Sequence, residues 1–223
     1  MNLSQEQTVV NTITFVKKTL KYAEGGHDWF HINRVYTNAL SIAKTEKVDI
    51  FIIALGALLH DIADAKFHDG DETIGPKIAR SFLESEKVDE SQIQHIENII
   101  KYISFKGELA SSNQKRFTSK ELDVIQDADR LDAIGAIGIA RTFNYGGFKN
   151  RVIYDPEIPP KLTQTKEEYK KSTAPTINHF YEKLLLLKDR MNTKTGQKLA
   201  QERHTFMEQF LEQFYRETSP KSI

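Results

Sequence analysis

The chain has 223 residues, with 31 basic residues balanced by 31 acidic ones, 39% hydrophobic residues and no cysteine. The zero net charge argues against general electrostatic capture of nucleic acid or anionic lipid. The lack of cysteine excludes disulfides, thiolate zinc sites, iron–sulfur clusters and a cysteine nucleophile, so histidine and carboxylate side chains must hold any bound metal.

Helical signals follow one another through the first two thirds of the chain. Short polar residues that can cap a helix stand before apolar stripes at helical spacing. The predicted caps are Ser4 with Gln7, Asp28, Asp49, Asp89 with Gln92, and Thr118 with Glu121. The predicted helices cover about residues 4–22, a segment after Asp28, a segment containing Ile50–Leu59, a stripe of Ile74, Ile78 and Phe82, a segment after Asp89, and a segment from Thr118 toward Phe143.

The apolar run Ile50–Leu59 is compatible with a buried strand as well as a helix. Its alanine and leucine residues favour a helix, and no β-rich partner segment lies nearby. We therefore predict a buried helix, which at this length is too short to cross a bilayer.

The last third of the chain is predicted to begin with a long loop. Residues 144–176 contain Gly146-Gly147 and four of the six prolines. Two amphipathic helices follow at about residues 176–191 and 196–216. The second carries Leu199, Phe206, Phe210 and Phe214 on one side.

These elements predict an all-α fold and a single domain over residues 1–223. A helical core at about residues 20–145 would carry the functional residues, with the C-terminal helices at about 176–216 packed on it. The polar first residues lack the features of a signal peptide, so we predict a cytoplasmic protein that does not associate with membranes.

Two adjacent metal-binding groups, His60 and Asp61, end the apolar helix. At about 100° per residue, His31 lies on the same face as Val35 and Ile42, so it is predicted to project into the core. Such a histidine is either a metal ligand or a buried side chain that bonds a backbone carbonyl.

Asp129 is predicted to point inward, since it lies within about 40° of Leu122 and Ile125 on the helix. Asp127 falls on the opposite face and is expected to be solvated. Asp132 leans inward and is expected to orient a histidine. A carboxylate in the core needs a cation or hydrogen-bond donors.

Together, His31, His60, Asp61 and Asp129 offer two imidazole nitrogens and two carboxylates from separate helices. This donor set suits octahedral Mn²⁺, Fe²⁺, Co²⁺, Ni²⁺ or Mg²⁺ about as well as Zn²⁺. Four ligands in an octahedral field would leave two positions, one for a water that is activated for attack and one for a phosphoryl oxygen.

The spacing of His31, His60-Asp61 and Asp129 resembles the signature of the HD superfamily of metal-dependent phosphohydrolases. Longer strings are similar to the YpgQ/YedJ-like type of small bacterial HD protein, and the resemblance covers about residues 20–215. The strings are residues 26–35, 60–67, 103–105 and 127–141.

The resemblance implies an all-α HD fold and a metal-dependent nucleotide pyrophosphohydrolase, with Mn²⁺ as the expected metal. Such an enzyme would hydrolyse ribo- and deoxynucleoside triphosphates to monophosphate and pyrophosphate by a metal-activated water. It also implies that His31, His60, Asp61 and Asp129 are the metal ligands.

Asp64 matches a position where relatives of this family often keep an acidic or histidine residue near the attacking water. It is assigned as the general base or water-orienting group, and the alternative is an ion pair with Lys66. For the substrate phosphates, Lys66 and Lys106 are favoured over Arg130 and Arg141. His27 is assigned to substrate binding, while a role behind the metal ligands or as a loop cap stays open.

Other functions remain open at this stage. An HD site also suits a phosphodiesterase, a nucleoside monophosphatase, or a non-catalytic module that senses a nucleotide. A nucleic-acid-binding protein is disfavoured by the charge balance. A homodimer is compatible with the sequence, although no apolar stripe demands one.

Overall fold

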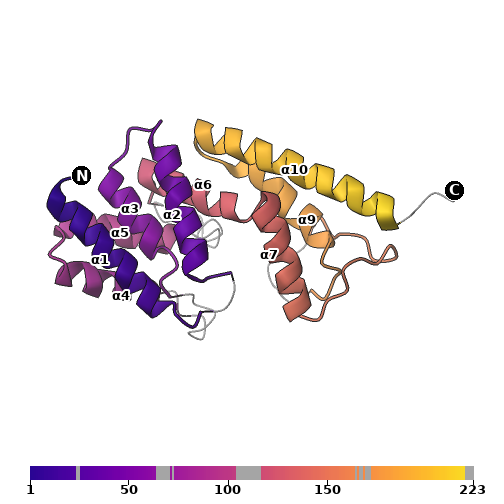
Figure 1. Cartoon of the computed structure of the whole chain (residues 1–223), viewed down its shortest axis with the longest axis horizontal. Coiled ribbons are helices and arrows are strands. Elements are labelled where there is room, and N and C mark those ends of the chain that lie inside the picture. Colours follow the sequence, from indigo (N-terminus) through magenta and orange to yellow (C-terminus); the bar gives the residue numbers. More distant parts are fainter. Residues whose placement is uncertain are drawn as a thin grey trace. The chain divides into compact units, whose positions relative to one another are not determined.

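The computed structural model describes residues 1–23, 26–63, 71, 73–103, 117–163, 165, 168 and 172–218. The regular structure of these residues is helical, which confirms the predicted all-α fold (Figure 1). The chain forms two compact units, Met1–Asp129 and Arg130–Ile223. The single domain over residues 1–223 stays a prediction.

The first unit is built around α3. Its helices are α1 (Leu3–Thr19), α2 (Trp29–Ala43), α3 (Ile50–Leu59), α4 (Ile74–Ser85), α5 (Glu90–Tyr102) and most of α6 (Lys120–Asp132). α3 contacts α1, α2 and α5, and all of its residues after Ile50 are buried. A helix that is hydrophobic all round must be covered on every side, so the run Ile50–Leu59 becomes the core of the unit.

Two predicted N-caps stabilise the starts of α2 and α3, the helices that position His31 and His60. The Asp28 side chain accepts a hydrogen bond from the backbone N–H of His31 at 2.9 Å. The Asp49 side chain accepts one from the N–H of Phe51 at 2.8 Å. Both predicted caps are therefore confirmed. Asp89 is the N-cap of α5, but its side chain makes no capping hydrogen bond.

The predicted cap of the first helix is wrong by two residues. Asn2 and Gln5, rather than Ser4 and Gln7, form the capping box, with reciprocal hydrogen bonds of 2.9 and 3.0 Å. The helix then ends at Thr19. The earlier pair satisfies the backbone groups at the true helix start, which leaves Ser4 inside the first turn.

The predicted helix from Thr118 toward Phe143 is divided in two. The N–H of Leu122 donates to Oγ of Ser119 at 3.0 Å, so the cap lies one residue later than predicted. α6 ends at Asp132, and α7 (Gly135–Phe148) begins after a break. Gly135 has a φ of 74°, which side chains other than glycine rarely adopt, and this conformation marks the break.

The second unit contains α7, α9 (Asn178–Glu182), the 3₁₀ helix η3 (Leu184–Arg190) and α10 (Lys194–Thr218). The predicted loop starts later than residue 144, because α7 continues to Phe148. The helix predicted over residues 176–191 is replaced by short α9 and η3. The N–H groups of Thr176 and Ile177 donate to the carbonyls of Val152 and Ile153 at 2.9 and 3.0 Å, which ties the end of the loop to its beginning.

Aromatic side chains form the centre of the second unit. Phe143, Phe180 and Phe210 lie with their ring centroids 5.8–6.0 Å apart. Phe206 was predicted to share this side of α10, but its side chain is 49% exposed. The buried face of α10 lies beside the predicted stripe and consists of Gly196, Ala200, His204, Met207 and Leu211. Among the described residues, no helix combines the length and apolar character needed to span a membrane.

Candidate functional site

Three side chains from three elements of the first unit converge in a cluster. His31 lies in the first turn of α2, His60 follows the last residue of α3, and Asp129 lies near the end of α6. Each offers a ligand atom, and these atoms all lie within 4.8 Å of one another. Nε2 of His31 is 3.6 Å from Oδ1 of Asp129, and Nε2 of His60 is 3.9 Å from the same oxygen.

The backbone around α3 selects the tautomer of His60. Nδ1 of His60 lies 2.8 Å from the carbonyl oxygen of Ala57, and only a protonated Nδ1 can donate to that oxygen. The Nε2 lone pair is then left on the side of Asp129. Burial lowers the pKa of His60, although the Asp129 and Asp61 carboxylates oppose this effect. His60 is therefore held as the neutral, metal-binding imidazole.

The capping of α2 places the second imidazole. The Asp28 side chain accepts a hydrogen bond from the N–H of His31. This bond stabilises the first turn of α2, which carries His31. His31 is 2% exposed, and its ring makes an edge contact with that of His60, with centroids 5.3 Å apart.

Asp61 is bonded to a residue 34 positions away in the sequence. Its Oδ2 forms a hydrogen bond with Nδ1 of His27. Burial acts to raise the pKa of Asp61, but the His27 hydrogen bond, together with the electrostatic influence of the surrounding imidazoles, outweighs it and holds this pKa well below its usual range. The Asp61 carboxylate is therefore ionised, as a metal ligand must be.

The cluster fits a divalent metal ion. His31, His60 and Asp129 are the residues that would hold it, and two nitrogens with one carboxylate oxygen are ordinary ligands for Zn²⁺ and for first-row divalent ions. Asp61, the fourth predicted ligand, adjoins His60 in the sequence. Its role as a ligand stays a prediction.

The predicted faces of α6 require a correction. Asp127 was expected to be solvated, but it is fully buried, whereas the Asp129 side chain is 40% exposed. The prediction failed because α6 is covered on more than one side. Its buried apolar residues are Leu122, Val124, Ile125, Ala128 and Leu131. Periodicity cannot reveal a buried carboxylate on such a helix.

Two of the four basic candidates for phosphate binding are used within the second unit. Nη1 of Arg141 donates to Oδ2 of Asp132 at 2.6 Å, so this buried carboxylate is paired with an arginine. Nη1 of Arg130 donates to the carbonyl oxygen of Arg190 at 2.6 Å. The preferred Lys66 and Lys106 lie outside the described residues, and so does Asp64.

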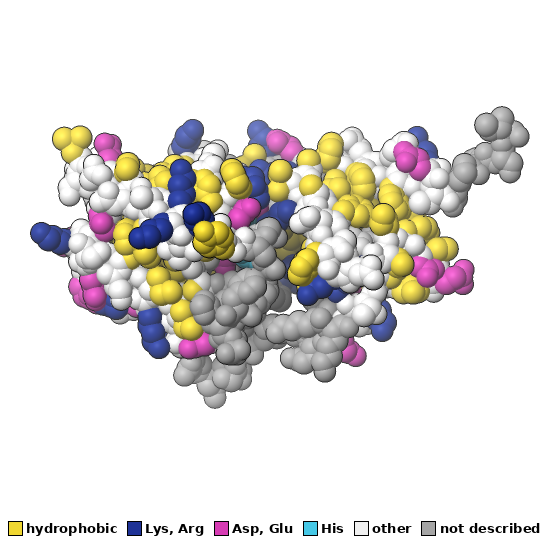
Figure 2. Space-filling model, turned by 60° about the horizontal axis from the view of Figure 1, so that its bottom comes forward, with side chains coloured by type: hydrophobic (Ala, Val, Ile, Leu, Met, Phe, Trp, Pro, Cys, Tyr) yellow, Lys and Arg dark blue, Asp and Glu magenta, His cyan; other side chains and the backbone are white. Residues whose placement is uncertain are grey.

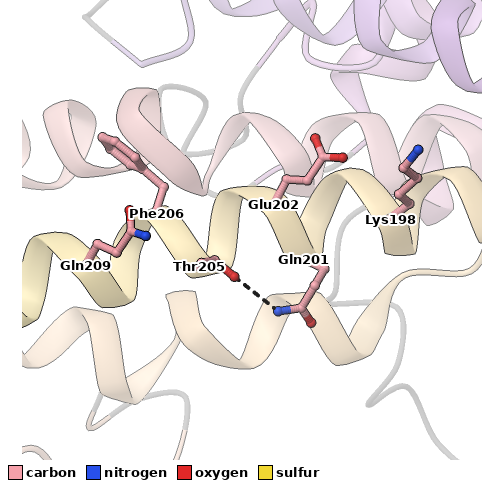
Figure 3. A pocket seen from close by; sticks show the side chains of 6 residues that line it. All are labelled: Lys198, Gln201, Glu202, Thr205, Phe206 and Gln209. Atoms are coloured by element: carbon pink, nitrogen blue, oxygen red, sulfur yellow. Dashed lines mark hydrogen bonds between the residues drawn. The ribbon is translucent and has the colours of Figure 1, made fainter.

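A shallow hollow of about 630 Å³ lies elsewhere, on α10 of the second unit (Figure 3). One helix supplies its whole lining, and the side-chain amide of Gln201 donates to Oγ1 of Thr205, one turn further along α10, at 3.4 Å. The lining residues are Lys198, Gln201, Glu202, Thr205, Phe206 and Gln209. Such an open surface lacks the grouped metal ligands of the first unit and is not the candidate site.

Comparisons with known proteins agree with this geometry. The family model described as "HD domain" matches residues 29–134. The protein YpgQ of Bacillus subtilis is 39% identical over 204 residues, which cover 90% of this chain and 88% of YpgQ.

Solved structures extend the similarity to nearly the whole chain. An HD-superfamily hydrolase from Bacillus thuringiensis is 43% identical, with a TM-score of 0.77 over 97% of this chain and 100% of its own. The structure of B. subtilis YpgQ in complex with ADP is 32% identical, with a TM-score of 0.74 over 98% of each chain. The chain therefore belongs to the HD-domain family and is a metal-dependent phosphohydrolase.

Proposed function

We propose that this protein is a nucleotide pyrophosphohydrolase that converts ribo- and deoxynucleoside triphosphates to monophosphate and pyrophosphate, with Mn²⁺ as its metal. The observation that carries the proposal is the cluster of His31, His60 and Asp129, whose ligand atoms lie within 4.8 Å of one another. A nucleotide substrate is supported by the relative YpgQ, whose structure was solved in complex with ADP.

The chain's own groups suit this reaction. A bound divalent ion would supply Lewis acidity toward a phosphate group. His60 keeps Nε2 available because Nδ1 bonds the carbonyl of Ala57, and the carboxylates of Asp129 and Asp61 would balance the charge of the ion. In the proposed reaction, a water oxygen bonds to the α-phosphorus and gives up a proton to a base or to solvent, while the bond from the α-phosphorus to the oxygen that bridges to the β-phosphorus breaks, and pyrophosphate leaves with that oxygen. Asp64 is the residue predicted to orient this water.

The charge distribution favours a small substrate over a nucleic acid. Among the described residues on the face shown in Figure 2, basic and acidic side chains are interspersed and form no continuous basic stripe. A protein that follows a phosphate backbone needs such a stripe. The predicted cytoplasmic location remains part of the proposal.

The deciding experiment is hydrolysis of a nucleotide panel by metal-stripped protein, with and without added Mn²⁺. The panel contains ribo- and deoxynucleotides from mono- to triphosphate, and the products are separated by chromatography. We expect monophosphate and pyrophosphate to form from triphosphates only when metal is present.

The other HD activities give different products. Orthophosphate released from a monophosphate would replace the proposal with a nucleoside monophosphatase, and cleavage of a phosphodiester would replace it with a phosphodiesterase. Tight nucleotide binding with no product after prolonged incubation with Mn²⁺ would indicate a sensing module.

A further inference from the structure

The segment before α2 brings His27 to the candidate site. Gly26 has a φ of 123°, which residues other than glycine rarely adopt, and Asp28 then caps the helix. His27 lies between Gly26 and the helix cap at Asp28. Its side chain is 26% exposed and that of its partner Asp61 is 20% exposed, so their contact is largely shielded from solvent.

His27 contacts the site at two places. Its Nδ1 forms the hydrogen bond with Oδ2 of Asp61, and its ring makes an edge contact with that of His31, with centroids 6.0 Å apart. His27 therefore contacts His31, which belongs to the cluster, and bonds Asp61, which follows His60 of the cluster in the sequence.

The hydrogen bond limits what the carboxylate of Asp61 can do. Without a partner, an aspartate carboxylate rotates broadly about its last torsion. A donor on Oδ2 fixes this rotation and leaves Oδ1 as the oxygen for a further interaction. A ligand oriented in advance loses less conformational freedom when a metal binds, and for this reason outer hydrogen-bond partners of metal ligands affect metal affinity.

We propose that His27 is a positioning residue, whose Nδ1–H holds Oδ2 of Asp61 so that the other carboxylate oxygen is available to the metal. This inference rests on the metal site of the proposed function. It differs from the substrate-binding role predicted for His27 from the sequence, because Nδ1 donates to a carboxylate instead of a phosphate.

Two substitutions of similar polarity separate these roles. In His27→Asn, the side-chain amide nitrogen is bonded to Cγ, as Nδ1 is in histidine, so the donor to Asp61 is kept. In His27→Gln, the amide nitrogen lies one atom further out, nearer to the place of Nε2. The variants His95→Asn and His95→Gln are the matched controls, because His95 lies in the same unit and contacts Ser119 at 3.0 Å instead of the cluster.

The measurement is Mn²⁺ binding to metal-stripped protein by titration calorimetry, without nucleotide. We expect His27→Gln and His27→Ala to weaken Mn²⁺ binding by about 10- to 100-fold, and His27→Asn to stay within about threefold of wild type. Circular dichroism of the metal-free proteins confirms that each variant is folded.

A double-mutant cycle tests whether His27 acts through Asp61. In an Asp61→Ala background, titrated at Mn²⁺ concentrations high enough to measure its weakened binding, His27→Ala should cause little further loss of Mn²⁺ affinity, because the group that it positions is absent. An equal loss in both backgrounds would overturn the proposal.

Three further outcomes would also overturn it. The first is unchanged Mn²⁺ affinity in His27→Ala. The second is a raised KM for nucleotide in the His27 variants at unchanged Mn²⁺ affinity, which indicates phosphate binding. The third is a loss of Mn²⁺ affinity in His27→Asn as large as in His27→Ala, which indicates that His27 is a direct metal ligand. If wild-type protein binds Mn²⁺ but hydrolyses no nucleotide, only the proposed function fails. If it binds no divalent metal, both proposals fail.

Discussion

At the scale of single residues, the candidate site depends on how each ligand is held in place. His60 bonds the carbonyl of Ala57 through Nδ1, and the helix cap at Asp28 bonds the backbone of His31. Asp129 is the most exposed member of the cluster, with 40% of its side chain accessible. Its removal therefore deletes a charge at the site without opening a cavity in the core.

We predict that Asp129→Ala abolishes Mn²⁺ binding and lowers kcat/KM by more than about 100-fold, because this carboxylate is the proposed metal ligand and the proposed counter-charge for the ion. Titration calorimetry, product chromatography and circular dichroism measure the metal affinity, the activity and the helicity, which should stay close to that of wild type. Full activity of this variant after metal depletion would refute the metal site. His95→Ala is the control and should leave both properties unchanged.

A histidine of the second unit predicts an acid dependence of stability. Burial, together with the charges of Lys183 and Arg151, lowers the pKa of His179 to about 3. Between about pH 6.5 and pH 3, the unfolded chain binds a proton here that the folded chain does not, so stability falls as the pH falls. One such group contributes at most about 1.4 kcal/mol per pH unit.

Urea unfolding of metal-free protein at several pH values tests this dependence. Wild-type protein should lose stability from pH 6.5 downward, and His179→Asn should show a shallower slope. Part of the slope will remain, because burial also lowers the pKa of His60. Equal slopes for both proteins would contradict the prediction.

At the scale of helices, the close approach of α7 to the following loop depends on one glycine. A Cβ atom at Gly146 would lie 2.2 Å from Oγ1 of Thr176, whereas one at Gly147 would meet no atom within 4 Å. The two neighbouring glycines of α7 therefore have opposite expected responses to the same substitution.

We predict that Gly146→Ala destabilises the protein by about 1–3 kcal/mol through overpacking, while Gly147→Ala is neutral or stabilising by up to about 1 kcal/mol. Thermal and urea unfolding compare the two variants directly. Adding Thr176→Ala to Gly146→Ala should restore much of the loss, and an unrescued loss would show that the clash with Thr176 is not its cause.

At the scale of the whole molecule, the two compact units raise the question of whether they unfold together in one cooperative transition. The candidate metal site lies in Met1–Asp129, and α6 crosses the boundary into the second unit. A ligand that binds only the folded state stabilises it by about 2.7 kcal/mol at a concentration of 100 times Kd. If the chain is a single domain, this stabilisation must reach both units.

Calorimetric unfolding of the metal-stripped protein, with and without Mn²⁺, provides the test. We expect one transition whose Tm rises with the Mn²⁺ concentration. Two transitions, of which only one moves, would show that the units unfold independently and would refute the single domain over residues 1–223. The Asp129→Ala variant is the control, since its Tm should not respond to Mn²⁺.

The sequence by itself determined the features that depend on local physics. The apolar run Ile50–Leu59 requires burial on all sides, and it forms α3 at the centre of its unit. Asp28 and Asp49 can satisfy the free N–H groups at helix starts and do so. The spacing of His31, His60 and Asp129 identified the family, and these residues meet in the structure.

Only the tertiary structure decided which faces are covered and which distant residues meet. Asp127 is buried because α6 packs on several sides, and Phe206 is exposed because α10 buries a neighbouring stripe. The bond between His27 and Asp61 joins residues 34 positions apart. Helical period and caps are set by neighbours in the chain, whereas burial and long-range pairing depend on which elements pack together, and no local signal records that packing.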